Sequence, residues 1–214
     1  MTLRLGDTAP DFTATTTHGP IQFHDWLGDS WAVLFSHPRD FTPVCTTELG
    51  QLARLHDEFQ RRGVKLLGTS IDTVQAHYQW VREVRESQGS IIDFPIIADL
   101  DRTVAGLYGM LHPNHDASFT VRSLFVIDPR KQLRLTLTYP QSCGRNFDEV
   151  LRTIDSLQLT DAHHVITPAH WRVGDDVIIP PAFSDEEAHR IFDKGWRAVT
   201  PYLRLTPDPR GAVL

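Results

Sequence analysis

The sequence of 214 residues contains few of the residues that build disulfide frameworks or metal sites. It has only two cysteines, Cys45 and Cys143, and neither lies in a Cys-x-x-Cys pair. Two thiols do not form a disulfide framework in a chain of this length, so each is judged by its surroundings. The eleven histidines include no His-Glu-x-x-His pattern. We therefore expect no metal and no other cofactor.

The chain also lacks a surplus of basic residues and any long apolar run. Its 21 basic and 27 acidic side chains give a formal net charge of -6, which predicts no affinity for nucleic acid. The first twelve residues do not resemble a signal peptide. No apolar run approaches the roughly 20 residues of a membrane span. These absences predict a cytoplasmic protein with no membrane span.

The apolar residues that are present predict alternating strands and helices. Patterns of buried strands occupy residues 31–35 and 64–71, and helical spacing occupies 49–59 and 74–84. Further along the chain we expect a strand over 94–98, a helix over 103–108, strands over 122–128 and 132–139, and a helix over 147–157. This order predicts an α/β fold with a central mixed sheet flanked by helices.

The composition changes near residue 160. From Pro168 onward prolines are frequent and no long periodic element is present. Such a segment buries little surface by itself, so we expect it to pack on the main domain or on another subunit. The sequence therefore predicts a main domain over residues 3–160 and a small C-terminal domain over 161–214.

The residues around Cys45 fit the start of a helix. Thr42 suits the N-cap, Pro43 the first helical position, and Cys45 then lies in the first turn. The positive end of a helix favours thiolate over thiol, which makes a cysteine there reactive. Because position 42 is threonine rather than cysteine, the expected oxidant is an external molecule, which favours a peroxidase over a disulfide exchanger. An inert buried thiol is the alternative.

The residues from Ser36 to Glu48 closely resemble the active-site signature of the one-cysteine peroxiredoxins. The resemblance continues over residues 23–31, 139–140 and 144–149, so it covers nearly the whole chain. It implies a thioredoxin-like fold with a C-terminal dimerisation domain, and therefore a homodimer, with larger assemblies left open. It also implies a thiol-dependent peroxidase that reduces hydrogen peroxide and organic hydroperoxides in antioxidant defence.

The resemblance also implies roles for individual residues. Cys45 corresponds to the peroxidatic cysteine, which peroxide oxidises to a sulfenic acid, and the Thr42 hydroxyl to the group that helps hold thiolate and peroxide. Arg122, in Thr120-Val121-Arg122, corresponds to the arginine that stabilises the thiolate. The other pocket positions are Pro38, Pro43, His37 and Arg145. For the last two, a packed histidine and a surface salt bridge are the alternatives.

A sulfenic acid needs a second thiol to return to the reduced state. Cys143 is the only other cysteine of the chain and hence the only internal candidate. The one-cysteine pattern does not require a cysteine at this position. We therefore expect Cys143 to be an idle loop thiol, and the reductant to be external, such as glutathione or a thioredoxin-like protein.

Three further functions stay open. Some members of the closest subgroup are also described as phospholipases with a Gly-x-Ser-x-Gly serine and a nearby histidine, which Ser30 and His24 match. Ala32 replaces the final glycine, and Arg130 occupies the position of the acid, with Asp128 two residues earlier, which weakens this triad. The second function is that of a non-catalytic holdase, and the third is that of a peroxide sensor that relays the oxidation of Cys45.

Overall fold

The computed structural model describes residues 3–116 and 118–210, which form two compact units. The first unit ends at Phe147 and the second begins at Asp148. Helix α6 (Phe147–His163), which the sequence pattern assigned to the main domain, falls almost wholly in the second unit. The domain boundary near residue 160 stays a prediction.

The first unit is built on a mixed sheet with the strand order β2-β1-β5-β4-β3-β6-β7. Strands β3, β4 and β5 are parallel, and the other neighbours are antiparallel. The buried runs expected as strands form the centre of this sheet, which confirms the predicted mixed sheet. The strands are β1 (Thr13–Thr16), β2 (Gly19–Gln22), β3 (Trp31–Ser36), β4 (Val64–Ser70), β5 (Ile96–Ala98), β6 (Arg122–Ile127) and β7 (Leu133–Tyr139).

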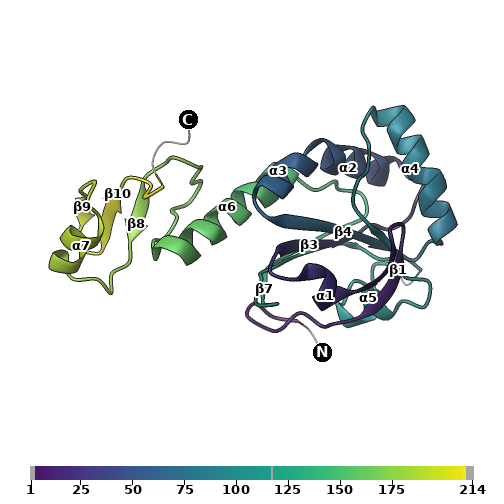
Figure 1. Ribbon diagram of the computed structural model, residues 1–214, viewed down its shortest axis with the longest axis horizontal. Helices are drawn as coiled ribbons and strands as arrows, with labels where there is room; N and C mark the ends of the chain where they lie inside the picture. Colours follow the sequence, from purple (N-terminus) through teal and green to yellow (C-terminus); the bar gives the residue numbers. More distant parts are fainter. Residues whose placement is uncertain (1–2, 117, 211–214) are drawn as a thin grey trace. The chain divides into compact units, whose positions relative to one another are not determined.

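Helices cover both faces of this sheet. Figure 1 shows α2 (Pro43–Arg54), α3 (His56–Arg61) and α4 (Val74–Gln88) on one face, and α1 (Phe23–Leu27) and α5 (Thr103–Leu107) on the other. The single helical pattern expected over 49–59 is divided at Leu55, whose backbone leaves the helical range at φ -92° and ψ 1°. Phe59 is nevertheless buried, so the apolar spacing continues across the break.

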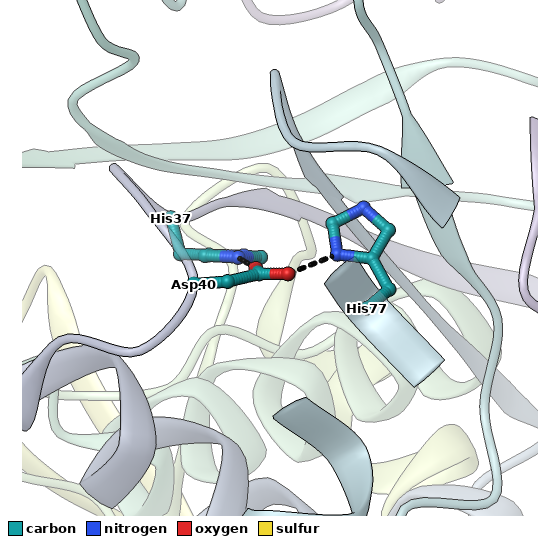
Figure 2. Close-up of side chains that lie close together, drawn as sticks. All are labelled: His37, Asp40 and His77. Carbon is teal, nitrogen blue, oxygen red and sulfur yellow. Dashed lines mark hydrogen bonds and ion pairs between the residues drawn. The ribbon is translucent and has the colours of Figure 1, made fainter. Parts of the chain in front are cut away.

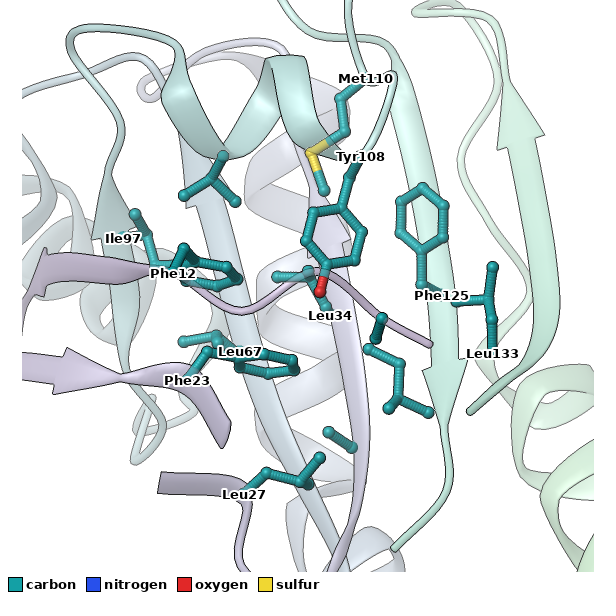
Figure 3. Packing of buried hydrophobic residues seen from close by; sticks show 14 of the residues in the cluster. Phe12, Phe23, Leu27, Leu34, Leu67, Ile97, Tyr108, Met110, Phe125 and Leu133 are labelled. Carbon is teal, nitrogen blue, oxygen red and sulfur yellow. The ribbon is translucent and has the colours of Figure 1, made fainter. Parts of the chain in front are cut away.

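The core between the sheet, α1 and α5 is rich in aromatic rings (Figure 3). Phe12 and Phe23 stack with ring centroids 4.8 Å apart, and Tyr108 meets Phe125 edge-on at 5.2 Å. The Tyr108 hydroxyl donates to Pro10 O at 2.7 Å, and burial raises the pKa of this phenol. Because side chains alternate along β3, Leu34 belongs to this core. Phe35 points to the opposite face of the sheet, on the side of α2, the helix that carries Cys45.

The second unit contains regular structure that the sequence did not predict. After α6 it forms an antiparallel sheet in the order β8-β10-β9, from β8 (Val177–Ile179), β9 (Arg197–Thr200) and β10 (Leu203–Thr206). Helix α7 (Asp185–Ile191) starts with a capping box between Ser184 and Glu187. These elements are too short to give a periodic pattern. Their own core contains Leu159, Val165, Trp171, Val177, Ile179, Ala188 and Phe192.

Within residues 3–116 and 118–210, none of the helices combines the length and apolar character needed to cross a membrane.

Candidate active site

Cys45 lies in the first turn of α2, directly after the loop that leaves β3. Thr42 occupies the N-cap with an extended backbone, and Pro43 opens the helix. The Thr42 hydroxyl does not cap the helix but donates to Arg39 O at 2.8 Å. The first-turn N–H groups therefore have no side-chain cap and lie at the positive end of the helix. The Cys45 side chain is 0% exposed.

Arg122, at the start of β6, is the charged group that touches the Cys45 sulfur. Its Nη1 donates to Cys45 Sγ at 3.3 Å, while Nε and Nη2 donate to Gln141 O at 3.0 and 2.7 Å. The guanidinium is thus fixed on two sides, with one nitrogen directed at the sulfur. A cation held in this way stabilises a thiolate.

Glu48 joins Arg122 to Arg145. It lies three residues after Cys45 on the same helical face, and its Oε2 accepts from Arg122 Nη1 at 2.9 Å and Arg145 Nη2 at 2.7 Å. Its Oε1 accepts from the backbone N and Nε of Arg145 at 2.8 and 3.0 Å. Arg145 is buried, which rules out the surface salt bridge considered for it, and also donates to Ser123 O at 2.8 Å.

The charges in this buried cluster do not cancel. Burial disfavours the charged form of Glu48, but the hydrogen bonds and charge of Arg145, together with the charge of Arg122, outweigh it and hold the pKa of Glu48 below its ordinary value. One ionised carboxylate therefore lies between two guanidinium groups. The unit of positive charge left over lies beside the Cys45 sulfur, and a thiolate there would neutralise it.

His37 belongs to a second buried cluster, shown in Figure 2. Its Nε2 lies 2.8 Å from Asp40 Oδ1, and His77 Nδ1, from α4, lies 2.6 Å from Asp40 Oδ2. Burial disfavours the charged form of Asp40, but the hydrogen bonds from both imidazoles hold its pKa below the ordinary value. Burial also lowers the pKa of His37, and Asp40 offsets this only in part. His37 Nδ1 is buried with no hydrogen-bond partner.

The same three residues are the one group of potential metal ligands in the part of the chain that the structure describes. Their ligand atoms lie within 4.8 Å of one another. Hydrogen bonds already join both Asp40 oxygens to the imidazoles, so we interpret the group as a hydrogen-bonded cluster. The absence of a metal stays a prediction.

The His37 ring contacts the Cys45 helix through Trp80. The two rings lie 4.9 Å apart, and Trp80 Nε1 donates to Thr46 Oγ1 at 3.1 Å, next to Cys45 in the sequence. Of the two prolines assigned to the pocket, Pro38 is buried and Pro43 is exposed. Cys143 is a free and exposed thiol in the loop between Gln141 and Arg145.

The phospholipase triad considered from the sequence is not assembled. His24 Nε2 lies 2.8 Å from Ala9 O, and its Nδ1 faces Asp11 at 3.9 Å, so both ring nitrogens lie against groups other than Ser30. The Asp128 carboxylate accepts from the backbone of Gln132 and from the side chains of Arg130 and Arg134.

Sequence reasoning missed several residues of the site. Glu48 is three residues from Cys45 and Asp40 lies within the signature, so their positions were visible but their partners were not. His77 lies on the apolar face of the expected helix over 74–84, where the spacing alone predicts a core position. Gln141 acts through its backbone carbonyl, which no side-chain pattern can reveal.

Comparisons with known proteins agree with this geometry. The pattern of the AhpC/TSA family matches residues 5–136, and that of the C-terminal domain of 1-Cys peroxiredoxin matches residues 156–194. The chain belongs to the AhpC/TSA family of peroxiredoxins. This peroxiredoxin is 53% identical to the 1-Cys peroxiredoxin of Dictyostelium discoideum over 97% of the chain and 86% of that protein. It is 49% identical to peroxiredoxin-6 of Gallus gallus over 97% of the chain and 98% of that protein.

Solved peroxiredoxin structures share the fold. The yeast mitochondrial 1-Cys peroxiredoxin superposes with a TM-score of 0.90 at 50% identity, covering 96% of this chain and 99% of that one. A cysteine-to-serine mutant of peroxiredoxin 6 from Arenicola marina gives a TM-score of 0.92 at 46% identity. The match covers 98% of this chain and 100% of that one. The peroxiredoxin described here is therefore a thiol peroxidase with a thioredoxin-like fold.

Proposed function

We propose that Cys45 is the peroxidatic thiol and that it reduces hydrogen peroxide and organic hydroperoxides by direct attack. The observation that carries this proposal is the 3.3 Å hydrogen bond from Arg122 Nη1 to Cys45 Sγ in a fully buried site. The excess positive charge of the cluster around Glu48 supports the thiolate form of Cys45. A holdase would need none of these contacts, so they favour a catalyst.

In the proposed reaction the thiolate attacks one peroxide oxygen and the O–O bond breaks. Cys45 becomes a sulfenic acid, and the departing oxygen takes up a proton and leaves as water or alcohol. Negative charge moves from the sulfur to this oxygen during the step. We expect Arg122 and the first-turn N–H groups to stabilise that charge more strongly in the transition state than in the ground state. The Thr42 hydroxyl donates to Arg39 O in this structure and would have to turn away from it to take the same part.

The test is peroxide consumption combined with intact mass. We expect one equivalent of hydrogen peroxide to oxidise the reduced wild-type chain rapidly at Cys45, and Cys45→Ser to consume none. Ser30→Ala serves as the control, since Ser30 lies outside this site, and it should match the wild type. Peroxide consumption that persists in Cys45→Ser would contradict the proposal.

We further propose that the reductant is an external thiol and that the protein acts in the cytoplasm. The free state of Cys45 and Cys143 is compatible with a reducing compartment. The yeast relative is described as a 1-Cys peroxiredoxin resolved by glutathione and thioredoxin systems, which supports the same two reductant classes here.

We also propose that residues 161–214 act as a dimerisation domain and that the protein is a homodimer. The match of residues 156–194 to the C-terminal domain of 1-Cys peroxiredoxin supports this. The second unit also exposes the apolar side chains of Ile191, Val199 and Tyr202, which association would bury. Sedimentation velocity tests the proposal, and a monomer at micromolar concentration would contradict it.

A further inference from the structure

The loop that carries Cys143 is tied on both sides of this thiol to residues near Cys45. Before it, Gln141 O accepts two hydrogen bonds from Arg122, the residue that also donates to Cys45 Sγ. After it, the backbone N of Arg145 donates to Glu48 at 2.8 Å. Cys143 therefore lies between two attachments to residues that surround Cys45.

The contacts of the two residues that follow Cys143 lead along the loop toward the start of α2. Arg145 contacts Glu48, while a Cβ atom added to Gly144 would lie 3.5 Å from Val44 Cγ1. Glu48 and Val44 are about one helical turn apart, so the chain from 145 back to 144 runs toward the N-terminal end of the helix. One residue further back is Cys143. Its backbone N–H donates to Pro140 O at 3.2 Å, which closes a turn of the loop.

The two thiols differ in their access to solvent. Cys45 is 0% exposed, whereas Cys143 is exposed. Thiol–disulfide exchange requires the attacking sulfur to reach the sulfur that it attacks. A protein reductant meets Cys143 at the surface but has no contact with the Cys45 sulfur while the site keeps this conformation.

We propose that Cys143 is the resolving thiol of this chain and that a dithiol reductant enters the cycle through it. This inference rests on the proposed peroxidase function of Cys45, and it replaces the interpretation of Cys143 as an idle thiol. The Cys143 sulfur attacks the sulfur of the Cys45 sulfenic acid. An S–S bond forms and the S–O bond breaks, and the hydroxyl leaves as water with the proton of the Cys143 thiol.

The second half of the cycle restores both thiols. One sulfur of the dithiol attacks Cys143, and Cys45 leaves as a thiolate that Arg122 stabilises through its hydrogen bond. The second sulfur of the reductant then displaces Cys143 as a thiol. The dithiol is oxidised to its own disulfide, and the two electrons it gives up equal those that the peroxide removed from Cys45.

The test uses the full chain, reduced and then treated with one equivalent of hydrogen peroxide under non-reducing conditions. We expect the wild type to lose two hydrogens in intact mass and to give one peptide pair linked through Cys45 and Cys143 within one chain. In Cys143→Ser, Cys45 should instead gain one oxygen and react with dimedone. We expect turnover supported by thioredoxin to fall about tenfold or more in Cys143→Ser, because Cys45 is buried.

A matched control moves the thiol by one position, in the double variant Ser142→Cys with Cys143→Ser. We expect a much lower yield of the internal disulfide in this variant. An equal yield would show that the position of Cys143 in the loop does not matter and would overturn the inference. Addition of one oxygen to Cys45 in both wild type and Cys143→Ser, with equal thioredoxin turnover, would overturn the inference and leave the peroxidase standing. A disulfide between two chains would also overturn it. Absence of any Cys45 oxidation would overturn both the inference and the proposed function.

Discussion

Two buried carboxylates lie on either side of Cys45 in the sequence, and each bridges two basic side chains. Asp40, in the loop before the helix, lies between the imidazoles of His37 and His77. Glu48, one turn into the helix, lies between the guanidiniums of Arg122 and Arg145. The hydrogen-bond patterns are similar, but the chemistry of the two partners differs.

A guanidinium stays charged at every pH at which proteins fold, whereas an imidazole changes charge near neutral pH. The cluster around Glu48, which includes the arginine that touches the sulfur, therefore keeps its positive excess across the physiological range. The cluster around Asp40 holds the loop before Cys45 and contains His37, whose pKa is lowered by burial. The positive charge beside Cys45 therefore does not change with pH in this range, whereas His37 can change its charge at a pH below its ordinary pKa.

The largest effect should come from Glu48→Ala, because it leaves two buried guanidiniums without their counter-charge. We expect the free energy of unfolding to fall by about 3–5 kcal/mol, measured by urea denaturation. Glu48→Gln keeps the size of the side chain and one acceptor oxygen, so we expect it to lower the free energy of unfolding by a smaller amount. The more exposed Glu58, which pairs with Arg61 and Arg62, provides the control. If Glu48→Ala lowers the free energy of unfolding no more than Glu58→Ala does, the buried carboxylate contributes no more to stability than the more exposed one.

Arg122→Lys should reduce the rate of Cys45 oxidation while keeping the charge. A lysine ammonium cannot reach Cys45 Sγ, Glu48 and Gln141 O together as the planar guanidinium does. We expect the rate constant with hydrogen peroxide to fall about 10²- to 10³-fold, measured by stopped-flow mixing. Arg145→Lys should lower this rate much less, since Arg145 contacts Glu48 rather than the sulfur. Equal losses in the two variants would contradict the separate roles.

Asp40→Asn should weaken the second cluster by a smaller amount. The amide can still accept from one imidazole, but its NH2 group faces the other, so one buried hydrogen bond is lost. We expect the free energy of unfolding to fall by about 1–3 kcal/mol in urea denaturation. Asp57→Asn, at an exposed position, is the comparison, and an equal change in both would show that the buried cluster adds no stability.

The smallest effect concerns pH. Because burial lowers the pKa of His37, the unfolded chain takes up a proton on this residue first, and stability falls as the pH drops below about 6.5. Asp40 and Glu48 also have lowered pKa values, so their contributions are lost only at more acidic pH, below about 4. We expect His37→Asn to flatten the slope of stability between about pH 7 and pH 5. Urea titrations at several pH values measure this, and an unchanged slope would assign the titration to another group.

The framework of the site follows from local sequence signals. The apolar run over 31–35 predicts the buried strand, and Thr42 and Pro43 predict the helix start that places Cys45 in the first turn. These features depend on neighbouring residues along the chain. The placement of Arg122 beside the sulfur came from the family resemblance rather than from any local pattern.

The remaining features depend on contacts between distant segments. Glu48 meets Arg145 and Asp40 meets His77 only because the sheet and helices bring them together, and one sequence carries no record of such pairings. The elements β8, β9 and β10 were missed for a different reason. Strands of three or four residues separated by prolines are shorter than the windows in which periodicity is visible.

Cys45 is completely buried whereas Cys143 is exposed, and this difference predicts that the two thiols differ in their access to bulky reagents. Hydrogen peroxide is about as small as water, whereas a bulky electrophile needs a wide opening to reach a buried sulfur. An alkylating reagent with a large ring system should therefore label Cys143 and spare Cys45 in the folded protein. In this chain the sulfur that contacts Arg122 is also the one hidden from bulky reagents.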